Sequence, residues 1–160
     1  MADYTTTAKF RMDVSDLKKG IQDAMRQIKL ANAEFKTASA GMDNWSKSAD
    51  GLSAKIKQQK TVLAQQKTIL AAYEKQLELV VKEYGENSKE ADNMKIKVEN
   101  QRATVIKAEK SLENYEKQLN EVEKEQAEAA KEAAKQDTAY EKLKGTIDAQ
   151  ETELQQLKKE

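Results

Sequence analysis

The chain has 160 residues and contains no cysteine, histidine or proline. Without cysteine and histidine it cannot form disulfides, Cys/His zinc sites or histidine-based catalytic schemes. Its 28 basic and 28 acidic residues are interspersed and give a net charge of zero. The sequence therefore lacks the basic stripe with which a protein binds nucleic acid or a membrane surface.

The composition favours long helices with narrow apolar contacts over a thick globular core. Hydrophobic residues make up 38% of the chain and charged residues 35%, against roughly 45–50% and about 25% in ordinary domains. The absence of proline removes the residue that most often breaks a helix interior. The start of the chain lacks the pattern of a secretory signal, and no apolar run is long enough to span a bilayer. We therefore expect no membrane segment.

Residues 1–14 differ in pattern from the rest of the chain. Ala8, Phe10, Met12 and Val14 alternate with charged residues after a run of threonines. This period of two is typical of a half-buried strand. We therefore predict a short N-terminal β-strand, with a frayed arm as the alternative.

Residues 15–51 are predicted to form a first helix and a polar corner. Ser15 is a suitable N-cap, so the helix is expected over residues 16–38. The corner that follows contains Gly41 and Gly51 together with serines and aspartates, which favour turns. Met42 and Trp45 lie within it, where they either fill the corner between two helices or dock a partner.

Two further helices are predicted, over residues 52–84 and 89–160. The turn between them, residues 85–88, holds Gly85 as a C-cap and Asn87 or Ser88 as the next N-cap. Gly145 is isolated and does not by itself break the last helix. The chain stops in mid-repeat without a C-cap, which we interpret as the end of a fragment.

Two series of residues, each with a period of seven, run through the chain and form an apolar seam. The first seam series is Ile21 and every seventh residue to Leu154, and nineteen of its twenty members are apolar or aromatic. The second seam series is Leu17 and every seventh residue to Leu157, with fifteen of twenty-one apolar. A stripe of this period packs helix against helix. The large residues expected to do so are Leu17, Ile21, Ile28, Phe35, Met42, Trp45, Leu52, Ile56, Leu63, Leu70, Tyr73, Leu77, Val80, Val98, Val105, Leu112, Tyr115, Leu119, Val122, Tyr140, Leu143, Ile147, Leu154 and Leu157.

The predicted fold class is therefore all-α, with long heptad-repeat helices and a short N-terminal strand or arm. The helices could form an extended coiled coil or fold back into hairpins at the turn residues Gly41, Gly51, Gly85, Asn87 and Ser88. The turn chemistry favours hairpins. The seam keeps its phase through both turns, which favours a rod of about 210 Å with hinges.

Repeated segments and seam glutamines add two further observations. The pentapeptide YEKQL occurs at residues 73–77 and again at 115–119, an offset of 42 residues or six heptads. Such repetition can lengthen a helical array without changing its local structure, unless the match is a coincidence of low complexity. The seam glutamines Gln59, Gln66, Gln101, Gln136 and Gln150 either restrict register and partner number or mark loose packing.

No candidate catalytic residue, cofactor or metal site is predicted. The many carboxylates are expected on solvated helix faces, not in a pocket that would shift their pKa values. No phosphate-binding or calcium-binding motif is present. We therefore do not expect an enzyme.

Beyond these general features, two stretches resemble a known family. Residues 9–56, above all VSDLKKGI and GMDNWSKSADGL, resemble the N-terminal segment of phage tail tape measure proteins. The motif EYGENSKEA at residues 83–91 is similar to one in their helical repeats. The resemblance covers nearly all of the chain, although members of that family are usually several times longer.

The resemblance implies a structural protein of a long-tailed phage, a prophage or a related tail-like particle. Copies of such a protein lie along the tail axis, set tail length and leave the tail when DNA is ejected. The implied partners are further copies of the chain, the tail tube protein, tail assembly chaperones and tail-tip or baseplate proteins. The implied location is the host cytoplasm during assembly and then the tail lumen. The alternative is a generic coiled-coil adaptor or chaperone-like clamp whose helices fold back on themselves.

Overall fold

The computed structural model describes residues 3–158, with side chains from residue 14 onward. It divides into two compact units, Met1–Leu119 and Asn120–Glu160. The described residues form three α-helices and one short 3₁₀ helix, with no β-strand. The all-α class is confirmed.

Helix α1 spans Asp3–Ser39, so the predicted N-terminal strand is wrong. The alternating residues lie within this helix, and Ser15 lies in its interior instead of capping a helix that begins at residue 16. Phe10, Val14, Leu17 and Ile21 also recur at steps of four and three, which suits one helix face. A single strand has no second strand to pair with among the described residues, whereas a helix satisfies its own backbone.

A corner of nine residues joins α1 to α2, which spans Ala49–Tyr84. It contains the 3₁₀ helix η1, Trp45–Lys47. Ser48 caps α2, since its Oγ accepts a hydrogen bond of 3.0 Å from the N–H of Gly51. The side chain of Ser48 thus satisfies one of the amides that a helix start leaves without a partner.

The second turn separates α2 from α3, which spans Lys89–Leu157. Gly85 has φ +89° and its N–H donates to the carbonyl of Val81 at 2.9 Å, which ends α2. Ser88, and not Asn87, caps α3, because the Ser88 Oγ accepts from the N–H of Ala91 at 3.1 Å.

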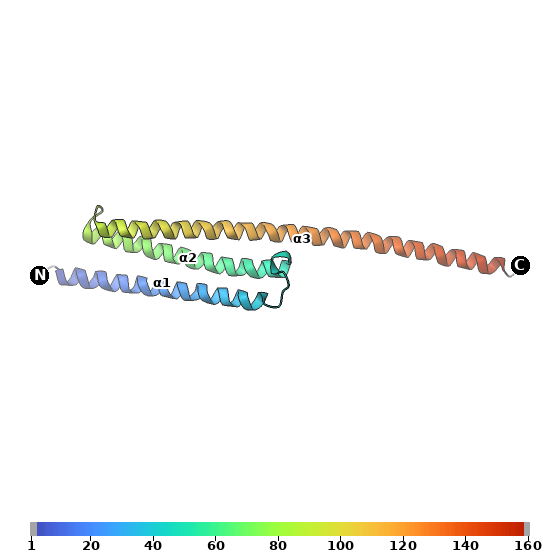
Figure 1. Cartoon of the computed structure of the whole chain (residues 1–160), viewed down its shortest axis with the longest axis horizontal. Helices are drawn as coiled ribbons and strands as arrows, with labels where there is room; N and C mark the ends of the chain where they lie inside the picture. Colours follow the sequence, from blue (N-terminus) through green and yellow to red (C-terminus); the bar gives the residue numbers. More distant parts are fainter. Residues whose placement is uncertain (1–2, 159–160) are drawn as a thin grey trace. The chain divides into compact units, whose positions relative to one another are not determined.

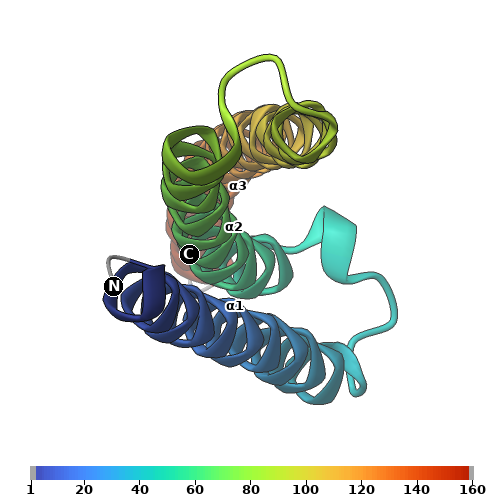
Figure 2. The same ribbon diagram turned by 90° about the vertical axis from the view of Figure 1, so that its left-hand side faces the viewer.

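Within the first unit the chain folds back at both turns (Figure 1). Figure 2, viewed along the helices, shows α2 between α1 and the first part of α3. The extended arrangement is therefore not the one that residues 14–119 adopt. The α1–α2 core contains Ile21 and Ala24 from α1 and Ile69 and Ala72 from α2, with Leu17, Ile28 and Tyr73 packed against it.

Candidate functional site: the aromatic corner and the helix seams

Three aromatic rings and one lysine meet where α1, η1, α2 and α3 come together in the first unit. The rings of Phe35 and Trp45 pack edge to face with centroids 5.1 Å apart, and those of Trp45 and Tyr115 lie 6.1 Å apart. Lys55 Nζ lies 4.6, 5.8 and 5.6 Å from the centroids of Phe35, Trp45 and Tyr115. We name these four residues the aromatic corner.

The electrostatics of the aromatic corner are set by two opposing effects on Lys55. Partial burial lowers the pKa of Lys55 because water no longer fully solvates the ammonium group. The three ring faces attract the same charge. The aromatic corner is therefore a structural junction in which the ammonium group of Lys55 lies against three aromatic rings.

Gly51 allows the backbone of Trp45 to approach the first turn of α2 closely. A Cβ at this position would lie 2.3 Å from the carbonyl oxygen of Trp45 and 2.6 Å from its Cα. Both atoms belong to the backbone, so they cannot move aside as a flexible side chain would. By contrast, a Cβ at Gly41 would meet nothing within 4 Å.

Three ion pairs link α2 to the part of α3 in the first unit, and we call them the ion-pair ladder. Lys60 pairs with Glu116 at 3.2 Å, Lys67 with Glu109 at 2.8 Å and Glu74 with Arg102 at 3.0 Å. Successive members are seven residues apart on each helix, and the two residue numbers of every pair have the same sum, as an antiparallel register requires. Each member directly follows a residue of the second seam series.

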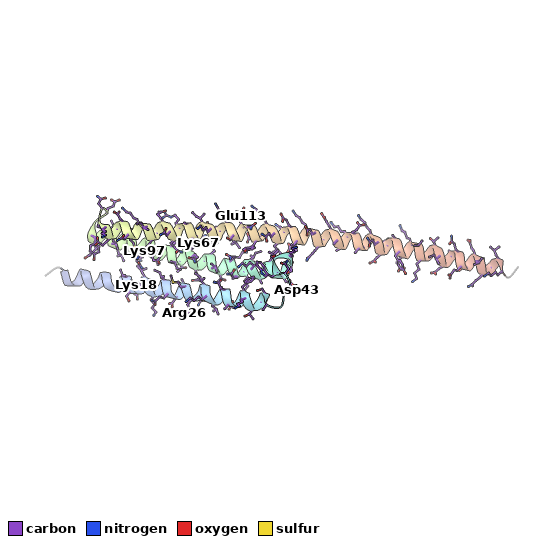
Figure 3. All side chains as sticks on the ribbon, viewed as in Figure 1. Lys18, Arg26, Asp43, Lys67, Lys97 and Glu113 are labelled. Carbon is purple, nitrogen blue, oxygen red and sulfur yellow. The ribbon has the colours of Figure 1, made fainter. Side chains whose placement is uncertain are left out.

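Lys67 on α2 and Glu113 on α3 carry exposed charged side chains (Figure 3). Contacts within single helices supplement the ladder, and among them the ammonium groups of Lys82 and Lys117 donate hydrogen bonds to Glu78 and Glu113. These contacts lower the pKa of both carboxyl groups. All of these groups are solvated, so each pair contributes little by itself.

Two seam glutamines contact each other inside the α2–α3 hairpin. Gln101 Nε2 donates to the backbone carbonyl of Gln66 at 3.0 Å and also to its side-chain oxygen. The contact favours the observed register, because a slide of α3 by one heptad along α2 would separate these two amides. For Gln66 and Gln101, this contact favours the interpretation that seam glutamines restrict register over the interpretation that they mark loose packing.

The described residues place the predicted seam in three environments. Of the large residues expected to pack along the seam, five are buried: Ile21, Leu52, Ile56, Val98 and Val105. Half-buried members are Leu17, Ile28, Phe35, Met42, Trp45, Leu63, Leu70, Tyr73, Leu77, Val80, Leu112, Tyr115, Leu119 and Val122. Tyr140, Leu143, Ile147, Leu154 and Leu157, all in the second unit, are exposed.

The seam did not predict a second buried face of α2. Gln58, Ile69, Ala72 and Gln76 are buried although none belongs to either seam series. Their spacing follows one helix side, but two of the four are glutamines, so the apolar pattern was weak. Lys55 was also missed, because two of its three ring partners, Phe35 and Tyr115, come from other helices.

Gln58 lies beside a small hollow between α1 and α2. Ala31, Phe35 and Ala54 are among the residues that line the hollow. Gln58 Nε2 donates to the Asn32 side-chain oxygen, while Gln58 Oε1 is buried without a partner among the described residues. A water bound in the hollow would satisfy this oxygen, because the hollow is open to solvent and partly polar.

Over residues 14–158, no three acidic side chains gather as a metal site would require. Nor does any stretch of the described helices combine the length and apolarity needed to cross a bilayer. Comparisons with protein-family models, curated proteins and solved structures gave no match to this chain.

Proposed function

We propose that this chain is a structural segment of a phage tail tape measure protein, a length-setting scaffold on which the tail tube assembles. Under this proposal, the segment forms antiparallel helical hairpins of coiled-coil type in the free chain. It assigns no catalytic residue and no cofactor. The resemblance of residues 9–56 and 83–91 to that family supports the assignment.

One observation carries the proposal: the seam keeps its phase across both turns. Met42, Trp45 and Ala49 continue the count through the first turn, and Tyr84 and Asn87 continue it through the second. A hairpin does not require this continuity, because each of its helices meets its neighbour independently. An extended helix does, because a change of phase would move the apolar stripe around the helix. The continuity therefore supports a second, extended arrangement of the same chain.

The ion-pair ladder supports the coiled-coil component of the proposal. Charged residues that flank the seam and recur every seven residues set pairing and orientation in coiled coils. In this chain they join α2 to α3 through exposed contacts, which are weak individually. The hairpin can therefore open without breaking a strong buried charge pair.

The proposed partners follow from the resemblance. They are further copies of the chain, the tail tube protein, assembly chaperones that keep the free protein in solution, and tail-tip or baseplate proteins. The proposed location is the host cytoplasm during assembly and the tail lumen afterwards.

The decisive experiment changes the length of the chain in the phage genome that encodes it. Deleting residues 78–119 removes 42 residues, which equals the offset between the two YEKQL segments. Because 42 residues are six heptads, the deletion preserves the phase of the seam. Tails measured by electron microscopy should shorten by roughly 63 Å, at about 1.5 Å per residue. Duplicating the same residues should lengthen tails by the same amount. Assembled tails of unchanged length in both variants would refute the ruler function.

An adaptor or clamp is the second candidate, and the closed corners favour it. The aromatic corner and the Gln66–Gln101 contact both hold the hairpins folded. The natural chain has no cysteine, so the double variant Gln66→Cys/Gln101→Cys can be linked selectively with a short bis-maleimide. A linked hairpin should block tail assembly if the chain must extend, whereas an adaptor would keep its function. The unlinked double variant is the control.

A further inference from the structure

The second unit presents an apolar face that no described residue covers. Tyr140, Leu143 and Leu157 are 67%, 59% and 69% exposed, and Ile147 and Leu154 are also exposed. Together with Val122 they continue the two seam series, whose members within the α2–α3 hairpin are buried or half-buried except near the turn. We call these six residues the open seam. Clustered large apolar side chains of this kind mark an interaction surface.

We infer that the open seam binds the same segment of a second copy of this chain in antiparallel orientation, in one register. This inference does not depend on the proposed function. It rests on the charges beside the open seam and on the pairing rule that the α2–α3 hairpin displays. An antiparallel partner is self-complementary, since each copy offers the same surface to the other.

The hairpin supplies the pairing rule. Every member of the ion-pair ladder directly follows a residue of the second seam series, on both helices. In the second unit, the residues at the equivalent positions are Glu123, Ala130, Asp137, Lys144, Glu151 and Lys158. We call these six residues the flanking series.

The flanking series matches itself when one copy is reversed. In one antiparallel register Asp137 faces Lys144 of the second copy, and Glu123 faces Lys158 of the second copy. Each pair occurs twice by symmetry, which gives four opposite-charge pairs. The remaining positions place Glu151 opposite Ala130, so no like charges meet within the flanking series. None of the four charged residues takes part in an ion pair within the described part of the chain.

Antiparallel registers displaced by one heptad are unfavourable. A slide in one direction sets Asp137 against Asp137 and Glu123 against Glu151 of the second copy. A slide in the other direction sets Lys144 against Lys144 and Asp137 against Glu151. Like charges at these positions oppose association. The charges therefore disfavour both one-heptad displacements. A slide of two heptads again pairs opposite charges, Asp137 with Lys158 and Lys144 with Glu151. In that register the double variant Asp137→Lys/Lys144→Asp would bring like charges together at both pairs, so a charge swap distinguishes it from the inferred register.

A parallel pair in register is less well matched. In a parallel pair, a residue that directly precedes a member of the first seam series faces a residue of the flanking series on the second copy. The number of that flanking residue is higher by five. Glu132 would then face Asp137, and only Glu153 with Lys158 would attract. The like-charge and opposite-charge pairs would offset each other.

Gln136 provides a third match. In the hairpin, Gln66 directly precedes Lys67 and Gln101 directly precedes Arg102, and these two belong to successive pairs of the ion-pair ladder. The same offset in the inferred pair places Gln136 opposite Gln136 of the second copy, at the symmetry axis. Two amides in contact at that point oppose sliding, as the Gln66–Gln101 contact does in the hairpin.

The test is a charge swap in the full chain, with the dimer dissociation constant measured by sedimentation equilibrium. Asp137→Lys and Lys144→Asp should each raise that constant about fivefold, because two attractive pairs become repulsive. The double variant Asp137→Lys/Lys144→Asp should restore it to within about twofold. A parallel pair predicts the opposite sign for Asp137→Lys, since a lysine there would face Glu132. Unchanged helicity by circular dichroism controls for folding.

A second measurement reads the orientation directly. Single spin labels on Lys124→Cys should lie about 40 Å apart along the axis in the antiparallel dimer. A parallel dimer would bring them close together. A monomeric chain, a short label distance, or charge variants that leave dimerisation unchanged would each overturn the inference.

Discussion

Gly51 and Trp45 approach so closely that an added Cβ at residue 51 would lie 2.3 Å from the Trp45 carbonyl oxygen. This contact joins the first turn of α2 to η1 and thereby positions the Trp45 ring between Phe35 and Tyr115. Glycine at this position therefore permits the close approach that accompanies the packing of Trp45 against Phe35 and Tyr115.

The first prediction concerns this contact. Gly51→Ala should lower the free energy of unfolding of the first unit by about 2 kcal/mol, within the usual range for forced overpacking. Gly41→Ala is the matched control, since its new methyl group meets nothing within 4 Å. Urea unfolding followed by Trp45 fluorescence measures both variants. Equal stability of the two variants would show that the corner relaxes without cost.

The second prediction concerns the turn between α2 and α3. Gly85 has φ +89° and ψ 157°, a region of backbone conformation that is almost restricted to glycine. Gly85→Ala should therefore destabilise the hairpin by about 1–3 kcal/mol. Gly145→Ala, inside α3 and free of close neighbours, should instead stabilise its helix by up to about 1 kcal/mol. Thermal unfolding followed by circular dichroism distinguishes the two signs.

The third prediction tests the ion-pair ladder. Lys67→Glu places like charges opposite each other at Glu109 and should cost about 0.5–1 kcal/mol of hairpin stability. The double variant Lys67→Glu/Glu109→Lys should recover most of that loss. The difference should shrink at 1 M salt, where screening acts over about 3 Å. A double variant as unstable as the single one would mean that the pair itself contributes nothing.

The fourth prediction concerns pH. Burial lowers the pKa of Lys55 below its usual 10.5, so between the lowered value and 10.5 the folded chain binds fewer protons than the unfolded chain. Stability should therefore rise with pH across that window. Lys55→Met should remove this rise, whereas the exposed Lys57→Met should retain it. Urea unfolding at several pH values between 8 and 11 measures the slope.

The helix ends were predictable where local chemistry determines them. Gly85 and Ser88 mark the second turn in the sequence, and they end α2 and cap α3 in the structure. The N-terminal strand was wrong because Phe10 and Val14 fit a period of two as well as a helix that continues through Leu17. Local pattern alone did not distinguish the two, whereas the missing strand partner does.

The three-dimensional arrangement of the candidate site was less predictable. Trp45 was expected to fill the corner or dock a partner, and it packs against Phe35 and Tyr115. The position of Lys55 among those rings depends on both hairpins closing, because Phe35 and Tyr115 are far apart in sequence. The second buried face of α2 escaped notice because Gln58 and Gln76 interrupt its apolar pattern.

α2 has neighbours on both sides, and this has a consequence for amide hydrogen exchange. Its Ile69 and Ala72 pack against α1, while its Gln66 contacts α3. Opening α2 must break both interfaces, whereas α1 can detach by breaking one. Exchange should therefore be slowest in the middle of α2 and faster in α1. Because both interfaces join elements adjacent in sequence, the first unit should also refold rapidly.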